Sequence, residues 1–447
     1  MMDTIRRNKN IAAGALCACL LIAAGLVYGD AGKVFPAART KVITIGVFSD
    51  SYWEVQNGYS YHILEDAIAA FEQKYPDARV EYTSGIMKAD YSEWLSEQIL
   101  SGKTPDLFFV LPEDFNTLVD VGVLKNLSSF IERDASFDEE QFYLAAYQCG
   151  QFEGQQYSLP YECAPKLMFM NKSILYREGI EIPAEDWTWE DFYDICRQVT
   201  KDTDGNGLAD QFGVVGYTWQ DAFDSNGIEL FSQDGTSCNF TGSNVEAAIA
   251  FTADLDSLNS TVIPTTRDFD LGNVAFQPMS FSEHRAYKAY PLSVKKYSGF
   301  EWGCIPMPAG PDGDNRSTLD TLLIAMNGET KNSAYAWEFL KLLVCDTRIQ
   351  SEIFEYSEGV SPLREVTESD ETLERLIEDA GDSSTLNQSI LGAAVENAVV
   401  APRFRNYDDA LAEVDRAVND IVNGDTKIGT GMLMWDRTIN RKLKNRT

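Results

Sequence analysis

The chain has 447 residues, of which 44% are hydrophobic and 12% aromatic, so it is long enough for two or three domains with packed cores. Its 69 Asp and Glu residues outnumber its 37 Lys and Arg residues, giving a formal net charge of −32 that is spread along the chain. This charge argues against nucleic acid and anionic membrane surfaces as partners.

The N-terminus has the features of an export segment. Arg6, Arg7 and Lys9 precede an uncharged stretch over residues 11–28, and this order places the basic end in the cytoplasm. The length of the stretch lies at the border between a signal-peptide core and a membrane anchor. We therefore expect an exported protein on the outer face of the cell membrane, either anchored by or cleaved after residues 11–29.

Strand-like and helix-like segments alternate in the next part of the chain. Strands are predicted over residues 41–49, 78–83 and 105–110, and helices over residues 63–75 and 91–100. This alternation predicts a parallel sheet covered on both faces. Such sheets bind ligands outside the carboxyl ends of their strands, where residues 49–53, 84–87 and 111–115 fall.

From Gly150 the pattern changes. A hairpin is predicted over residues 151–157 and a buried strand over 167–170. Helices are predicted over 189–200, 244–255, 334–344 and 407–423, and Thr188 is the expected N-cap of the first of these. Six cysteines remain outside the N-terminal stretch, without CxxC pairs, which excludes a zinc ribbon and a dense disulfide scaffold. Cys149 and Cys163 could meet, but buried free thiols are the favoured interpretation.

Residues 202–210 place oxygen ligands on alternate positions around a glycine turn, which is typical of a calcium loop. The expected ligands are Asp202, Asp204, Asn206, the Leu208 carbonyl, Asp210 and Gln211. Gly213 stands where an EF-hand has its bidentate Glu, so Gln211 would supply an amide oxygen instead. The alternative is a solvated Asp/Gly turn. Because the loop leaves no position open for a substrate, a bound Ca²⁺ would be structural.

Several short motifs occur together in a fixed order. They are Gly102 with Pro105-Asp106-Leu107, Gly122-Val123-Leu124, Leu159-Pro160, Met170-Asn171-Lys172, Thr188-Trp189-Glu190-Asp191-Phe192, Gln211-Phe212-Gly213 after the Asp202 loop, Phe269-Asp270-Leu271-Gly272, Pro306 to Pro308, Ala336-Trp337-Glu338-Phe339-Leu340 and Gly359-Val360-Ser361-Pro362. Through this combination of motifs the chain resembles the extracytoplasmic solute-binding proteins of ABC sugar importers, the group that includes maltodextrin-binding proteins.

This resemblance implies an α/β, two-lobe periplasmic-binding-protein-like fold of type II, with the ligand cleft between the lobes. The chain would cross between lobes near residues 161–164, 319–322 and 358–362. Residues 1–40 would then be the signal or anchor segment, residues 41–162 plus 319–360 the N-terminal (first) lobe, and residues 163–318 plus 361–447 the C-terminal (second) lobe. Leu319-Asp320-Thr321 is a departure, because many relatives have small glycines at this crossing.

A sugar site needs aromatic rings that stack on apolar C–H faces and planar polar groups that bind hydroxyls. Tyr52 and Trp53 follow the first strand, and Glu113 and Asp114 follow the third. The resemblance adds the crossing and the second lobe. The expected ligand-binding residues are Tyr52, Trp53, Glu113, Asp114, Tyr161, Glu162, Tyr217, Trp219, Phe281, His284, Arg405 and Tyr407.

The rival interpretation is a secreted glycoside hydrolase, which would need a pair of carboxylates flanking the scissile bond. Other chemistries lack their motifs: the chain has no HExxH, GxSxG or GxxxxGK[ST], and His62 and His284 are its only histidines. A binder of a non-sugar solute is a further alternative. We expect a monomeric binding protein without bond chemistry, which delivers a mono- or oligosaccharide to the membrane subunits of an ABC importer.

Overall fold

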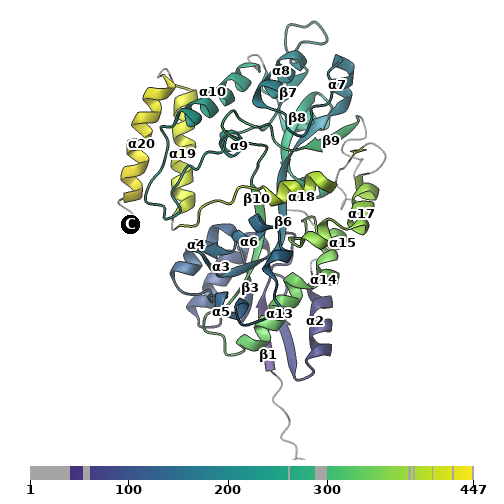
Figure 1. The fold of residues 1–447 in the computed structure, drawn as a ribbon, viewed down its shortest axis with the longest axis vertical. Coiled ribbons are helices and arrows are strands. Elements are labelled where there is room, and N and C mark those ends of the chain that lie inside the picture. The colour runs from purple at the N-terminus through teal and green to yellow at the C-terminus, as the bar shows by residue number, and fades with distance from the viewer. Residues whose placement is uncertain are drawn as a thin grey trace, which may run out of the picture.

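The computed structural model describes residues 41–53, 61–259, 262–286, 300–380, 384–385, 388–404, 406–424 and 427–444. The predicted export segment within residues 1–40, and Arg405, lie outside the described residues. Two α/β lobes are joined by strands that run through a waist (Figure 1). Within the described part of the chain, no helix combines the length and the apolar character needed to cross a membrane.

The first lobe is built on a mixed sheet in the order β6-β10-β3-β1-β2, where β1 pairs in parallel with β2 and β3, and β10 runs antiparallel to β3. Its strands are β1 (Lys41–Gly46), β2 (Ala78–Tyr82), β3 (Leu107–Val110) and β10 (Leu319–Met326), with a hairpin of β4 (Gln151–Phe152) and β5 (Gln155–Gln156). Its helices are α2 (His62–Lys74), α3 (Lys88–Leu100), α4 (Pro112–Asp120), α5 (Ser128–Ile131), α6 (Leu144–Gln148), α13 (Ser333–Cys345), α14 (Thr347–Ser351) and α15 (Ile353–Tyr356), with a short 3₁₀ turn at Glu139–Gln141. The parallel strands, the hairpin and the helices predicted here are confirmed within a few residues.

Helix α2 shows why these segments fold as they do. Its apolar residues recur on one face, and Ile63, Leu64, Ala67 and Phe71 are all buried. Phe71 meets Phe339 of α13 edge to face, with 5.1 Å between the ring centroids. The two helices therefore cover the same side of the first-lobe sheet.

Strand β6 (Ser158–Asn171) belongs to both lobes. Its residues 158–165 pair with β10, whereas residues 166–171 pair with strands of the second lobe. Cys163 lies between Thr321 of β10 and Val360, which bridges it from the other side. Three chain segments thus lie side by side at the waist, at the positions where the resemblance placed the crossings.

The second lobe packs helices around the far half of β6. Its strands are β7 (Phe212–Val214), β8 (Val274–Ser280), β9 (Trp302–Ile305) and β11 (Ser384–Thr385). Its helices are α7 (Lys172–Glu178), α8 (Trp189–Val199), α9 (Trp219–Ser225), α10 (Ser243–Ser257), α11 (Thr266–Asp270), α12 (Phe281–Ala286), α19 (Tyr407–Val422) and α20 (Ile428–Lys444). The predicted Thr188 N-cap is confirmed, since Thr188 and Asp191 form a capping box at the start of α8.

Helices α17 (Asp370–Ala380) and α18 (Gln388–Glu396) lie at the waist beside the first lobe (Figure 1), and α16 (Arg364–Thr367) contacts both of them and α14. Leu363 bridges Phe142, and the Tyr143 amide donates to the Pro362 carbonyl at 3.0 Å. These contacts differ from the expected placement of all of residues 361–447 in the second lobe. They favour a boundary nearer Val399, after which α19 and α20 pack on α10.

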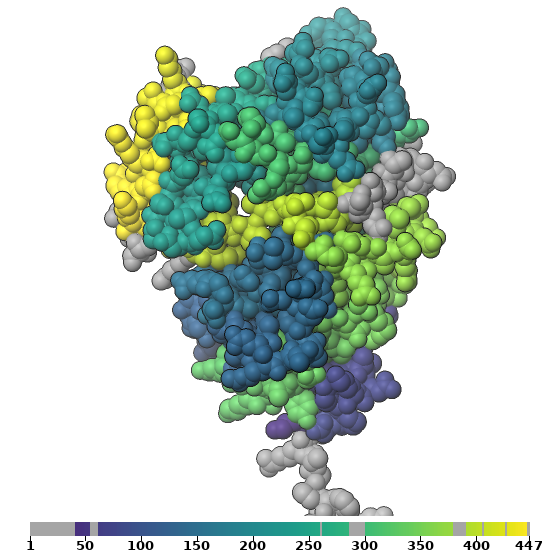
Figure 2. Space-filling model, in the orientation of Figure 1, coloured from purple at the N-terminus to yellow at the C-terminus, as the bar shows by residue number. Residues whose placement is uncertain are grey.

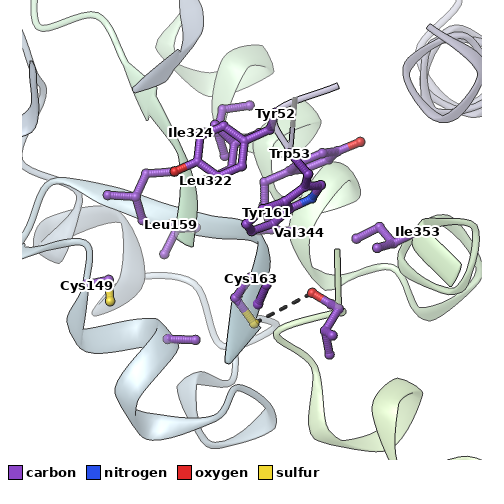
Figure 3. Packing of buried hydrophobic residues seen from close by; sticks show 14 of the residues in the cluster. Tyr52, Trp53, Cys149, Leu159, Tyr161, Cys163, Leu322, Ile324, Val344 and Ile353 are labelled. Atoms are coloured by element: carbon purple, nitrogen blue, oxygen red, sulfur yellow. Dashed lines mark hydrogen bonds between the residues drawn. The ribbon is translucent and has the colours of Figure 1, made fainter. Parts of the chain in front are cut away.

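Cys149 and Cys163 are both buried and both free, which agrees with the favoured interpretation. The Thr321 hydroxyl donates to the Cys149 sulfur at 3.5 Å, while the Cys163 thiol donates to the Val360 carbonyl at 3.6 Å (Figure 3). The Cys163 thiol therefore joins two crossing segments, the Cys149 thiol joins the end of α6 to β10, and neither cysteine is in a disulfide.

Candidate functional site

A pocket of about 60 Å³ lies at the carboxyl ends of β1 and β3, where the first lobe meets the crossing segments. It has room for several water molecules. It is lined by Val47, Phe48, Asp50, Ser51, Tyr52, Tyr61, Ile63, Leu64, Phe109, Tyr161, Glu162, Leu322, Tyr356 and Ser357. Three of the predicted ligand-binding residues, Tyr52, Tyr161 and Glu162, are therefore brought together from two separate strand regions.

Aromatic rings form much of this wall. Tyr52 and Trp53 meet edge to face with centroids 4.6 Å apart, and Tyr161 lies 5.1 Å from Phe109 (Figure 3). Tyr52, Trp53 and Tyr161 are 7%, 8% and 7% exposed. The rings are thus held in place by packing.

Glu162 is the buried carboxylate of the pocket. It accepts a hydrogen bond from the Ser357 hydroxyl at 2.5 Å, and burial raises its pKa to about 7, with the charge of Glu358 adding to the increase. A Cβ atom on Gly359 would lie 2.5 Å from Glu162 Oε2 and 2.8 Å from Trp53 Nε1. A glycine at position 359 therefore allows the third crossing, residues 358–362, to approach Glu162 and Trp53.

The floor of the cleft carries charged groups that the sequence reasoning missed. Asp320 of β10 stands opposite Ala164 of β6, and Lys166 lies two residues further along the same face of β6. The Lys166 ammonium forms an ion pair with Asp221 of α9 at 2.5 Å. Glu162, Ala164 and Lys166 occupy alternate positions of one strand, so the sequence could have predicted that their side chains share a face.

Lys88, at the start of α3, was also missed. Its ammonium donates to the Tyr52 carbonyl at 2.6 Å and lies 4.7 Å from the centroid of the Tyr52 ring. It thus holds the segment after β1 by a hydrogen bond and a cation–π contact. No sequence pattern marked this residue, because its partner is 36 positions away in the chain.

The two acidic residues after β3 point in different directions. Glu113 is exposed in the first turn of α4, and its charge contributes to the raised pKa of Asp320 and of Asp408 at the start of α19. Asp114 instead accepts a hydrogen bond from Ser92 of α3 at 2.6 Å. Successive residues of a helix point about 100° apart, so Asp114 faces α3 while its role in ligand binding stays a prediction.

Trp219 is buried in the second lobe, and Tyr217 is half-buried beside it. The Tyr217 ring packs against Phe192 and Phe251, and its pKa is raised by burial. Trp219 is 8% exposed, and its indole N–H donates to Asp415 of α19 at 3.0 Å. These rings join α9 to its neighbouring helices, and their part in ligand binding stays a prediction.

The other residues of the second lobe that were predicted to bind the ligand are Phe281, His284, Arg405 and Tyr407. Phe281 is fully buried, so its ring has no surface for a ligand and that prediction is corrected. His284 packs among aromatic rings, 4.3 Å from Trp302 and 5.1 Å from Phe169. Tyr407 is half-buried at the start of α19, and burial raises its pKa to about 12. Arg405 lies outside the described residues.

The Asp202 loop brings its carboxylates together at the surface. Oxygens of Asp202, Asp204 and Asp210 lie within 4.8 Å of one another. Asp202 accepts the backbone amides of Gly205 and Gly207, both at 2.7 Å, and these bonds lower its pKa. A set of ionised carboxylate oxygens is the donor type that suits Ca²⁺.

Asn206 and Leu208 lie within the same turn, where the Leu208 amide donates to the Asn206 side-chain oxygen at 2.8 Å. Gln211 is a correction to the predicted ligand set. It is buried, its side-chain oxygen accepts from Arg177 at 2.5 Å, and its amide nitrogen donates to Glu178 and the Val199 carbonyl. Its oxygen is therefore used inside the lobe and is not directed at the loop.

The family profile described as bacterial extracellular solute-binding protein matches residues 57–344 of the chain. The arabinooligosaccharide-binding protein of Halalkalibacterium halodurans is 26% identical over 182 residues, which cover 38% of this chain. The match spans 39% of that relative's own length.

Solved structures share the fold at low identity. The sugar-binding protein MalE from Xanthomonas citri has a TM-score of 0.73 and 15% identity, covering 91% of this chain and 98% of its own. An ABC substrate-binding protein of Listeria monocytogenes, solved in complex with cycloalternan, has a TM-score of 0.66 and 19% identity, covering 90% of this chain and 99% of its own. The two-lobe fold is therefore shared with these proteins.

Proposed function

Because this chain belongs to the family of bacterial extracellular solute-binding proteins, we propose that it captures a sugar or oligosaccharide between its lobes and delivers it to an ABC importer. The observation that carries the proposal is the meeting of Tyr52, Tyr161 and Glu162 in one pocket beside the crossings. Aromatic faces and a carboxylate are the groups a sugar's C–H faces and hydroxyls require.

Capture would occur by closure of the lobes. The space-filling view shows a hollow between the lobes, crossed by the segment around residues 390–404 (Figure 2). An open form would exchange with a closed one, and a sugar that contacts both walls favours the closed form. On this proposal Tyr52, Trp53, Tyr161, Glu162 and Glu113 form the first-lobe wall, and the protein makes and breaks no covalent bonds.

Calorimetry against maltooligosaccharides, arabinooligosaccharides and cycloalternan tests the proposal, with chromatography of each mixture to detect hydrolysis. We expect binding of at least one sugar, no hydrolysis, and weakening by about 2 kcal/mol or more in Tyr161→Ala, since anchoring aromatics dominate binding energy. Tyr176→Ala, at a 56% exposed position on α7, is the matched control. Hydrolysis of a sugar would establish the glycoside hydrolase alternative, and binding of only a non-sugar solute would overturn the sugar assignment.

We further propose that the Asp202 loop binds Ca²⁺ as a structural ion through Asp202, Asp204, Asn206, Asp210 and the Leu208 carbonyl. At calcium concentrations about a hundredfold above the dissociation constant, binding would stabilise the fold by about 2.7 kcal/mol. EDTA should then lower the melting temperature of the wild type but not of Asp204→Asn. Asp234→Asn, in another exposed Asp turn, is the control. An EDTA-insensitive wild type would leave the loop as a solvated turn.

We also propose that residues 1–40 direct export and that the protein acts as a monomer on the outer face of the membrane, where it docks with the importer's membrane subunits. The export features of residues 11–29 support this placement. Membrane fractionation, followed by sequencing of the mature N-terminus, separates anchoring from cleavage. Recovery of the full-length chain in the cytoplasm would contradict export.

A further inference from the structure

Arg285 is carried by the second lobe but is buried against the third crossing. It lies in α12, which follows β8 of the second-lobe sheet, and it is 4% exposed. Its guanidinium donates to the Phe354 carbonyl at 2.8 Å and to the Gly359 carbonyl, and it lies 5.3 Å from the Phe354 ring. One side chain therefore joins the second lobe to both ends of residues 354–359.

Residues 354–359 also form part of the first-lobe pocket. Ser357 lines the pocket and donates to Glu162, Glu358 accepts a hydrogen bond from Ser51 at 2.7 Å, and Gly359 adjoins Glu162 and Trp53. α15, at the start of this segment, packs on α2 of the first lobe. The segment that Arg285 holds is thus the one that positions the pocket's buried carboxylate.

The guanidinium also balances charge in this region. Glu162 and Glu358 are 4% and 5% exposed, and the positive charge of Arg285 lowers the pKa of Glu162 against the larger effect of burial. Among the described residues, the titratable and charged groups that interact with Glu162 include Tyr52 after β1, Tyr161 and Cys163 on β6, Glu358 from the third crossing and Arg285 from α12. Of these groups Arg285 carries the positive charge.

We propose that Arg285 is a positioning residue for ligand capture, which fixes the third crossing to the second lobe so that lobe closure and the Glu162 wall move together. The inference rests on the proposed function, since it assigns Arg285 a part in the same cleft. An arginine suits this role because its planar fork can donate to two carbonyl groups at once, which the single ammonium of a lysine does less well.

The test compares Arg285→Met and Arg285→Lys with the wild type. Arg197→Met, at an exposed arginine on α8, is the matched control. Calorimetry from pH 5.5 to 8.5 uses maltotriose or arabinotriose, whichever the wild type binds, and thermal melting confirms that each variant is folded. Small-angle X-ray scattering of the ligand-free proteins reports the lobe arrangement.

We expect Arg285→Met to bind at least tenfold more weakly, with the midpoint of its pH dependence moved upward because Glu162 stays protonated to higher pH. Arg285→Lys should restore the midpoint, because it keeps the charge, but only part of the affinity. The Arg197→Met control should match the wild type. A merely structural role would lower the melting temperature of Arg285→Met without moving the midpoint of binding.

Wild-type affinity and midpoint in Arg285→Met would overturn the proposal, as would a loss of thermal stability with an unmoved midpoint. If the wild type binds no sugar, the proposed function fails. Scattering alone then tests whether Arg285 links the second lobe to the third crossing. In that case a larger radius of gyration in Arg285→Met supports the link between the lobes, and an unchanged radius overturns it.

Discussion

The two walls of the cleft are built in different ways. On the first lobe, Tyr52 follows the carboxyl end of β1, whereas Tyr161 and Glu162 lie within β6, which pairs antiparallel with β10, and the three meet in one pocket. On the second lobe, the residues expected to bind the ligand lie near the beginnings of α9, α12 and α19, and of these Trp219 and Phe281 are buried. The carboxyl end of a parallel strand predicts where a side chain lies, whereas a helix start leaves its direction open.

The largest expected effect tests whether Trp219 belongs to the core or to the cleft. Trp219→Ala should lower the free energy of unfolding by about 3–5 kcal/mol, because it leaves a cavity between α9 and α19. Trp219→Phe keeps most of the ring and should cost about 1 kcal/mol through loss of the hydrogen bond to Asp415. Chemical denaturation measures both. Unchanged stability with lost sugar affinity would instead place this indole on the ligand and remove the contrast between the walls.

This contrast shows what the sequence could predict. The parallel strands of the first lobe, the amphipathic helices and the Thr188 N-cap depend on local patterns, and each was predicted. The residues that complete the site depend on contacts between distant segments: Lys88 with Tyr52, Lys166 with Asp221, and Arg285 with Gly359. Spacing along the chain carries no information about such pairs, because they form only when the fold brings distant segments together.

The predictions of ligand-binding residues at helix starts were limited by a second physical reason. Along α4 and α9 one position in sequence turns a side chain by about 100°, so a motif that locates the helix does not decide between neighbours. Glu113 is exposed and Asp114 bonds α3, while Trp219 is buried and Asp221 pairs with Lys166. Neither α4 nor α9 was among the helices predicted from the sequence, so the directions of Glu113, Asp114 and Trp219 could not be derived from it.

The second prediction concerns pH and the first-lobe wall. The folded-state pKa of Glu162 is raised from 4.5 to about 7, so folding favours its protonated form. Its contribution to stability is complete below pH 4.5 and is lost as the pH rises through 7, a change of about 3 kcal/mol. Glu162→Gln should remove this part of the pH dependence in denaturation curves from pH 4.5 to 8.5.

Asp224 is the matched group on the second lobe. Burial and the charge of Asp221 raise its pKa to about 7, so Asp224→Asn should remove a pH dependence of the same sign. The two substitutions are expected to differ in sugar binding, since only Glu162 lines the pocket. An equal loss of affinity in both variants would show that the second-lobe wall binds the ligand as directly as the first.

The smallest expected effect compares two nearly identical helix caps. Thr188 and Thr218 each form a capping box, with Asp191 and Asp221, and their hydroxyls donate to these carboxylates at 2.7 and 2.8 Å. Replacing either threonine by alanine should cost about 1 kcal/mol of stability. The caps differ in one respect: Asp191 is exposed, whereas Asp221 is 4% exposed and bound to Lys166.

That difference predicts a separation in function. Thr218→Ala frees the Asp221 carboxylate to shift with Lys166 on the cleft floor, so sugar binding should weaken about threefold, or ~0.7 kcal/mol, the size of a lost hydrogen bond. Thr188→Ala should leave affinity unchanged, because its helix start bonds only within the lobe at Ala309. Calorimetry at a pH where both variants are fully folded measures the difference. Equal affinities would mean that the Lys166–Asp221 pair only fastens α9 to β6, and the first-lobe wall would then account for recognition on its own.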